Sequence, residues 1–114
     1  MKLDNEALIP CTQFSSALSK DEANSLVNRL NGWYLIEKNG IQIISRHFTF
    51  KNYLSALEFA SSVASLAEQE DHHPRICIEW GKVTIDWWTH SINGLFINDF
   101  IMAARCERIF SELK

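Results

Sequence analysis

Residues 33–50 decide the fold of this chain: Trp33-Tyr34-Leu35-Ile36, then Lys38-Asn39-Gly40, then a segment from Ile41 to Phe50 that is rich in β-branched and aromatic residues. Both flanking segments have the composition of strands. Asn-Gly accepts the positive φ angles that a tight hairpin requires. The sequence therefore predicts a β-hairpin in the first half of the chain.

A second hairpin is predicted from residues 76–80, a turn at Gly81-Lys82, and residues 83–89. Successive side chains of a strand point to opposite faces of the sheet. One face of the last strand then carries Val83, Ile85, Trp87 and Thr89, and the other carries Thr84, Asp86, Trp88 and His90.

Three helices are expected around these hairpins. Ser19-Lys20-Asp21-Glu22 has the form of a capping box, which predicts a helix over 20–30 that ends at Asn31-Gly32. Apolar residues recur at helical spacing from Tyr53 to Ala67, and Asp71 to Pro74 ends that helix. Asn98 is the expected N-cap of the last helix, with Asp99 in its first turn.

The element order is thus α-β-β-α-β-β-α. It predicts an α+β fold of two layers, a four-stranded antiparallel sheet with helices on one face. Residues 1–18 show no clean periodicity and are expected to form an arm with at most partial order, before a domain over 19–114. The other face of such a sheet, or its edge, needs protection, and strand pairing between subunits is one way to provide it.

Composition restricts the function classes. A chain of 114 residues fits one domain, and its net charge of −3 comes without the basic stripe that nucleic acid binding needs. It contains no apolar run of ~18 residues, so no membrane span is expected. Three separated cysteines form no disulfide framework, which favours a reducing, cytoplasmic location. The first residues lack the pattern of a signal peptide.

Three of the four histidines lie close to acids and tryptophans. His72 and His73 follow Glu68 in the segment Glu68-Gln69-Glu70-Asp71-His72-His73-Pro74, and His90 ends Trp87-Trp88-Thr89-His90 shortly before Asn98-Asp99. Histidine exchanges protons near neutral pH. Adjacent residues of an extended segment face opposite ways, so His72 and His73 are expected to have different tasks.

The residues alone leave three interpretations open. The histidines could bind a metal, but the sequence has no HxH, HxxxH or HExxH spacing. Each could simply satisfy a nearby carbonyl. They could also act as acid and base on an organic ligand, with Trp33, Trp80, Trp87 and Trp88 as walls for a flat heterocycle, although each Trp could equally be core or interface.

The window from Glu68 to Arg105 resembles the pterin-4a-carbinolamine dehydratases, and the likeness covers about residues 19–110. It is carried by Glu68-x-x-Asp71-His72-His73-Pro74, Glu79-Trp80-Gly81-Lys82-Val83-Thr84, Trp87-Trp88-Thr89-His90-Ser91 and Gly94-Leu95-x-x-Asn98-Asp99-Phe100-Ile101-Met102-Ala103-Ala104-Arg105. The chain looks most similar to the bacterial branch linked to phenylalanine hydroxylation.

The resemblance implies the same α-β-β-α-β-β-α fold and the loss of water from 4a-hydroxytetrahydropterin, without cofactor or metal. It implies catalytic roles for His72, His73, His90 and Asp99, and an acidic site position at Glu68. We expect His72 and His90 to transfer protons, His73 to position the substrate, and Asp99 to hold His90. The substrate-binding residues are expected to be Glu68, Trp33, Pro74, Trp88 and Thr89.

The family likeness also suggests partners. It implies a pterin substrate, a homodimer or homotetramer, and a link to a phenylalanine hydroxylase. The alternative function is a pterin-binding or protein-interaction module of the dimerisation-cofactor kind. The stripe Met102, Cys106, Ile109 and Leu113 on the last helix would be its contact, unless that stripe belongs to the core.

Overall fold

The computed structural model describes residues 3–113, and the rest of the predicted arm and domain (residues 1, 2 and 114) lie outside that range. Its elements are η1 (Leu3–Asn5), α1 (Lys20–Val27), β1 (Tyr34–Lys38), β2 (Ile41–Thr49), α2 (Tyr53–Glu70), β3 (Arg75–Glu79), β4 (Lys82–Trp87), η2 (His90–Ile92) and α3 (Ile97–Glu112). Apart from the short η1 and η2, the order is α-β-β-α-β-β-α, as predicted.

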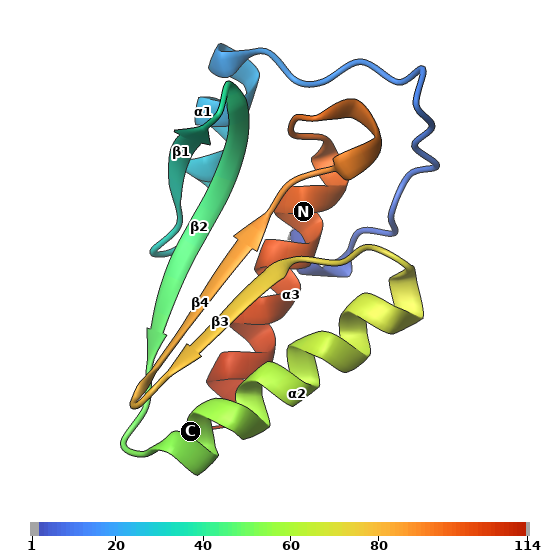
Figure 1. Ribbon diagram of the computed structural model, residues 1–114. Helices are drawn as coiled ribbons and strands as arrows, with labels where there is room; N and C mark the ends of the chain where they lie inside the picture. Colours follow the sequence, from blue (N-terminus) through green and yellow to red (C-terminus); the bar gives the residue numbers. More distant parts are fainter. Residues whose placement is uncertain (1–2, 114) are drawn as a thin grey trace.

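The two hairpins join into one antiparallel sheet with the strand order β1-β2-β4-β3 (Figure 1). Asn39 and Gly40 have φ angles of 52° and 79°, so the first turn has the left-handed conformation that its sequence predicts. In the second hairpin β4 begins at Lys82, and the turn therefore lies at Trp80-Gly81, one residue earlier than expected. The central pairing of β2 with β4 places Ile44 opposite Trp87.

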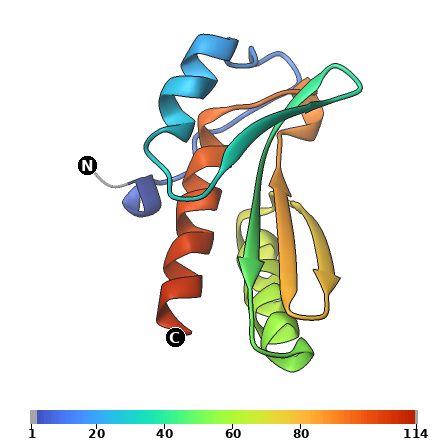
Figure 2. The same cartoon turned by 90° about the vertical axis from the view of Figure 1, so that its left-hand side faces the viewer.

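Helices α2 and α3 cover one face of this sheet (Figure 2). The core between the layers contains the inward side chains Val83, Ile85 and Trp87 of β4, each fully buried. Phe48 from β2 packs against Phe59 of α2, with ring centroids 4.6 Å apart. The predicted alternation along β4 is confirmed on this face.

The opposite face of the sheet carries a buried polar cluster. Asp86 is only 1% exposed there and accepts a hydrogen bond from Ser45 Oγ at 2.6 Å. Arg75 and Lys38 place their cationic groups 3.3 and 3.6 Å from the other carboxylate oxygen. Long charged side chains thus cover part of the face that the sequence left open.

Two predicted helix boundaries are wrong. Helix α1 begins with the predicted capping box at Ser19 and Glu22 but ends at Val27, because residues 28–32 turn toward β1. Helix α3 begins at Ile97, so Asn98 lies inside the first turn and is not the N-cap. Its amide instead bonds the backbone of the arm at Ile9. None of the helices described in residues 3–113 is long and apolar enough to cross a bilayer.

Candidate active site

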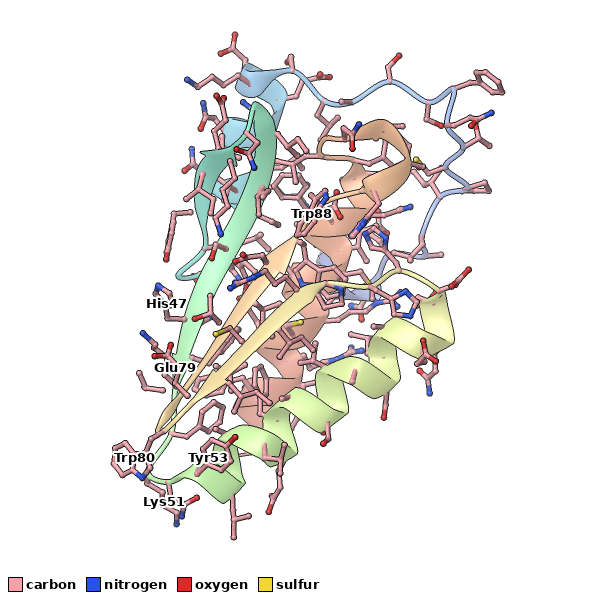
Figure 3. The ribbon with its side chains drawn as sticks, in the orientation of Figure 1. His47, Lys51, Tyr53, Glu79, Trp80 and Trp88 are labelled. Carbon is pink, nitrogen blue, oxygen red and sulfur yellow. The ribbon has the colours of Figure 1, made fainter. Side chains whose placement is uncertain are left out.

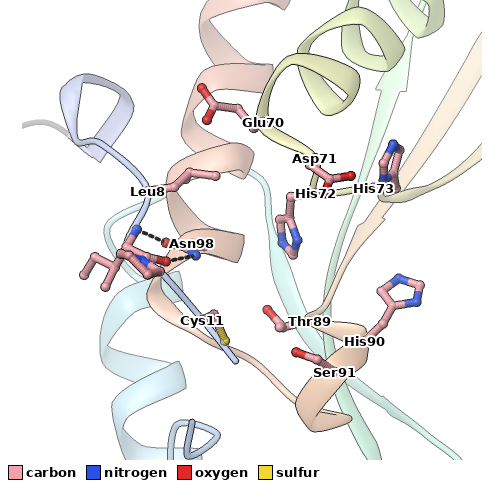
Figure 4. A pocket seen from close by; sticks show the side chains of 12 residues that line it. Leu8, Cys11, Glu70, Asp71, His72, His73, Thr89, His90, Ser91 and Asn98 are labelled. Atoms are coloured by element: carbon pink, nitrogen blue, oxygen red, sulfur yellow. Dashed lines mark hydrogen bonds between the residues drawn. The ribbon is translucent and has the colours of Figure 1, made fainter. Parts of the chain in front are cut away.

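A cavity of about 660 Å³ opens where the arm, the end of α2 and the connection between β4 and α3 meet (Figure 4). All three histidines singled out in the sequence line it. The remaining lining residues come from the arm, the end of α2, and the segment around η2 and α3: Leu8, Ile9, Pro10, Cys11, Glu70, Asp71, Thr89, Ser91 and Asn98. The fold therefore brings together residues that lie far apart in the sequence.

The end of α2 aims His72 into this cavity. Asp71 takes the left-handed conformation at φ 51°, and the His72 amide still donates to Ala67 O at 3.1 Å. This tight helix end turns the chain toward β3. The His72 ring stacks on the buried Trp87 indole, with centroids 5.4 Å apart and planes 20° apart. Trp87 is thus the floor under His72.

His72 is held by a buried carboxylate. Its Nε2 lies 2.6 Å from Asp99 Oδ1, and Asp99 has no exposed surface. Thr89 Oγ1 and the Phe96 amide donate to Asp99 Oδ2 at 2.8 and 3.0 Å. An ionised carboxylate only accepts, so Nε2 carries the hydrogen and Nδ1 is the nitrogen left for a ligand. The expected link from Asp99 to His90 is therefore replaced by a link to His72.

His73 has a different partner, as its place beside His72 predicts. Its Nε2 contacts Glu68 Oε2 from the last turns of α2, and both side chains are exposed to solvent. The two histidines thus have separate carboxylates, Asp99 inside the protein and Glu68 at its surface. Glu68 acts on the cavity only through His73, because it is not among the lining residues.

His90 begins η2 on the other side of the cavity. Thr89 and Gly94 form an isolated antiparallel bridge, in which the Thr89 amide donates to Gly94 O at 2.8 Å and closes the intervening loop. The exposed His90 ring stacks on Trp88, with centroids 4.5 Å apart and planes 14° apart. Trp88 therefore supports His90 and does not itself line the cavity.

Of the other residues expected to bind substrate, one lines the cavity, one lies beside it and one lies in the core. Trp33 is buried in the core, edge-on to Phe48 at 5.9 Å, and the structure does not bring it to the cavity. Pro74 follows His73 without lining the cavity, whereas Thr89 lines it and bonds Asp99. Trp87, which the sequence offered as a wall for a ligand, instead lies under the His72 ring, and the sequence reasoning missed the arm as a wall. The arm shows no periodicity or motif that could have revealed this role.

The side chains around the cavity are suited to proton transfer and hydrogen bonding. Two imidazoles have one ring nitrogen on a carboxylate, and the third is stacked on an indole at the solvent boundary. Within residues 3–113, no group of three or more His, Cys, Asp and Glu side chains is arranged to hold a metal ion. The arrangement can take a proton at one side of a bound ring and deliver one at another.

Comparisons with known proteins show what this chain is similar to. The family model described as pterin 4 alpha carbinolamine dehydratase matches residues 16–109. A protein of Vibrio vulnificus is 47% identical over 94% of this chain and 97% of its own length. One of Chlorobium luteolum is 40% identical over 98% of each chain. Both carry the name pterin-4-alpha-carbinolamine dehydratase as a provisional assignment.

Solved structures show the same fold. The crystal structure of a transcriptional coactivator/pterin dehydratase from Brucella melitensis aligns with a TM-score of 0.74 at 33% identity, over 82% of this chain and 98% of that one. A pterin dehydratase-like RuBisCO assembly factor of the alpha-carboxysome shares the fold with a TM-score of 0.59 at 22% identity. With a family model matched from residue 16 to 109 and relatives alike over nearly their whole length, this chain belongs to the pterin-4-alpha-carbinolamine dehydratase family.

Proposed function

We propose that this protein dehydrates 4a-hydroxytetrahydropterins to quinonoid dihydropterins. N5 loses its proton, the hydroxyl on C4a is protonated and leaves as water, and a double bond forms between C4a and N5. The observation that carries the proposal is the convergence of His72, held by the buried Asp99, with His73 and His90 around one cavity. This convergence supplies a base and an acid on different walls of the same site.

His72 is the base in this proposal. Its Nε2 hydrogen is engaged by Asp99, so Nδ1 can accept the N5 proton of the substrate. The carboxylate then lies directly beside the imidazolium that forms and stabilises it electrostatically. Asp99 is a positioning residue, because it does not line the cavity and acts through His72.

His90 is the acid that protonates the departing hydroxyl. It lies at the solvent-exposed rim, where imidazolium can be regenerated from water, and Trp88 fixes the plane of its ring. His73, oriented by Glu68, positions the substrate from the α2 side. Thr89 fixes Asp99 between these groups.

The proposal extends to the setting of the reaction. A 4a-hydroxytetrahydropterin is the product of a pterin-dependent aromatic hydroxylation, so we place this protein in tetrahydrobiopterin recycling, beside a phenylalanine hydroxylase in the cytoplasm. The family relationship supports this setting. It involves no cofactor, because the three histidines can supply both proton transfers.

The test is the rate of 4a-carbinolamine dehydration, followed by ultraviolet absorbance while a hydroxylase generates the intermediate. We expect His72→Ala and His90→Ala each to lower the rate by about 10²–10⁴-fold, the usual contribution of acid–base catalysis. The matched control is His47→Ala, because His47 bonds Tyr34 and Thr84 on the far face of the sheet. A loss of less than about tenfold from either site variant would contradict the assignment.

A second candidate role, self-association or partner binding, has its own support. The start of α2 and the β3–β4 turn expose Tyr53, Leu54, Leu57 and Trp80, with Leu54 at 69% and Trp80 at 74%. Figure 3 shows Tyr53 and Trp80 at the same end of the molecule. The two segments are adjacent because the Phe50 amide donates to Gly81 O at 2.8 Å. Large exposed apolar side chains grouped in this way mark interaction surfaces.

The contact stripe suggested for α3 is mainly core, because Met102 and Cys106 are fully buried. We therefore propose two kinds of surface for a homodimer or homotetramer. One is the exposed apolar group of Tyr53, Leu54, Leu57 and Trp80, and the other is the pair of edge strands, β1 and β3. Size-exclusion chromatography with light scattering tests this, and we expect Trp80→Ser to shift the mass toward the monomer. A wild-type monomer at micromolar concentration would contradict self-association.

A further inference from the structure

The arm before α1 is attached to α3 because the Asn98 side chain hydrogen-bonds the backbone of the arm. Asn98 Oδ1 accepts from the Ile9 amide at 2.8 Å, and Asn98 Nδ2 donates to the Ile9 carbonyl at 2.7 Å (Figure 4). Asn98 is only 7% exposed. Both hydrogen-bonding groups of one arm residue are thus satisfied by one buried amide, as a neighbouring strand would satisfy them.

Two arginines on the same helix continue this attachment. Arg105 donates to the Glu6 carbonyl at 2.8 Å and to Glu70 Oε2 of α2 at 2.7 Å. Arg108 lies 3.4 Å from the Asp4 carboxylate. Positions 98, 105 and 108 share one face of a helix, so the arm runs antiparallel along a polar stripe of α3. Leu3, with 6% exposure, anchors its start in the core.

The arm is therefore a strap, and its residues Leu8 to Cys11 form a wall of the cavity across from the histidines (Figure 4). Three of these side chains, Leu8, Ile9 and Pro10, are hydrocarbon. The Ile9 backbone groups are already used by Asn98, and proline has no amide hydrogen. This wall offers apolar contact and few hydrogen bonds, unlike the walls formed by Glu70, Asp71 and Ser91.

We infer that the strap residues Leu8–Cys11 form the subsite for the C6 substituent of the pterin and determine which substituted pterins the protein prefers. This inference rests on the proposed function. C6 is bonded to N5, so its substituent leaves the ring beside the atom that faces His72. The pyrimidine edge carries several donors and acceptors and suits the polar walls. The strap suits the carbon chain of a C6 substituent such as the dihydroxypropyl group of biopterin, whose terminal methyl group would pack on it.

The first test measures shielding of Cys11, whose side chain lines the cavity. Wild-type protein is alkylated with iodoacetamide, with or without biopterin or unsubstituted pterin, each at about ten times its dissociation constant from fluorescence titration. Biopterin should slow the labelling of Cys11 about tenfold, because only about a tenth of the sites are then empty. Pterin without a C6 substituent should slow it much less.

The same molecule contains the controls. Cys77 lies on β3 and is partly exposed outside the cavity, so its labelling should not respond to either ligand. Cys106 is buried, and burial raises the pKa of its thiol to about 12, so it should stay unlabelled. Asn98→Ala, which releases the strap, should abolish the difference between biopterin and pterin. Asn98→Asp keeps the acceptor for the Ile9 amide and should retain part of that difference.

The second test uses kinetics. Leu8→Ala should lower kcat/KM for a 6-substituted substrate about tenfold more than for the unsubstituted one, the low end of what a lost apolar contact costs. Leu113→Ala, at an exposed leucine at the end of α3 and far from the cavity lining, is the matched control and should leave that ratio unchanged.

The outcomes separate the two proposals. Binding of biopterin without shielding of Cys11, or equal shielding by both pterins, would overturn the strap inference and leave the proposed dehydration intact. Shielding that depends on the C6 substituent, in a protein that does not accelerate dehydration, would support the strap and overturn the catalytic proposal. Failure of both pterins to bind would overturn both.

Discussion

At the Asp99 carboxylate, three donors from three parts of the chain meet: the His72 ring, the Thr89 hydroxyl and the Phe96 amide. A buried carboxylate is tolerable only when such donors replace its lost hydration. The same bonds orient the imidazole, because a carboxylate that only accepts selects one tautomer of His72. Stability and the proposed catalysis thus depend on the same contacts.

Asp99→Asn should lower the dehydration rate by about 10²–10⁴-fold, because a neutral amide cannot stabilise the imidazolium and can select the wrong tautomer. The measurement is the rate of dehydration together with biopterin affinity by fluorescence, which should change much less. Asp86→Asn is the control, since Asp86 is an equally buried aspartate on the other face of the sheet. Equal rates in the two variants would contradict a role for Asp99 in catalysis.

At the scale of elements, helix ends and turns place the site residues. The left-handed Asp71 ends α2 and directs His72 and His73, and the Thr89–Gly94 bridge places His90. Helix α1 is short, and its N-terminus depends on reciprocal bonds between Ser19 and Glu22 at 2.8 and 3.1 Å. A helix of this length is marginal without its caps and its packing.

Ser19→Ala should lower the free energy of unfolding by about 0.5–2 kcal/mol, because one amide of the first turn loses its acceptor. Urea denaturation followed by circular dichroism measures this. Ser16→Ala, at an exposed position earlier in the same segment, is the control and should be nearly neutral. Matching midpoints for wild type and Ser19→Ala would show that the capping box contributes nothing.

Across the whole molecule, α3, β2 and the loop after α1 meet around Glu107. This partly buried carboxylate accepts from the Asn31 amide at 3.2 Å, and Arg46 donates to the Asn31 carbonyl at 2.7 Å. Arg46 also lies over the Phe48 ring at 4.3 Å. Burial raises the pKa of Glu107 above its usual value of 4.5, more than these donors lower it.

The folded state therefore holds the Glu107 proton more tightly than the unfolded chain does. Its contribution to stability is fully present below the unfolded pKa and is lost as pH rises through the folded pKa. The free energy of unfolding of wild type minus that of Glu107→Gln should thus fall as the pH rises through a range that starts at the usual value of 4.5. Urea titrations of both proteins across this range measure the difference, and a rising or constant difference would contradict the assignment.

Local signals predicted much of this fold from the sequence. The Asn39-Gly40 turn, the Ser19 capping box and the helical period over 53–67 depend on neighbouring residues, and the structure confirms them. The same locality explains two errors. The N-cap preference of Asn98 and the stop signal at Asn31-Gly32 suggested helix boundaries, but Asn98 bonds the arm and the chain after Val27 turns toward β1.

The sequence by itself determined the elements, their order and the sheet, because propensity, caps and hydrophobic period act over a few residues. It also indicated which three histidines line the cavity, because they lie close to acids and tryptophans in the chain. Only the tertiary structure decided that Asp99 holds His72 instead of His90, that Trp33 belongs to the core, and that the arm becomes a wall of the cavity. These contacts join residues 27 and 89 positions apart. Their partners are chosen by the packing of α3 against the sheet and the arm, and no local preference encodes that choice.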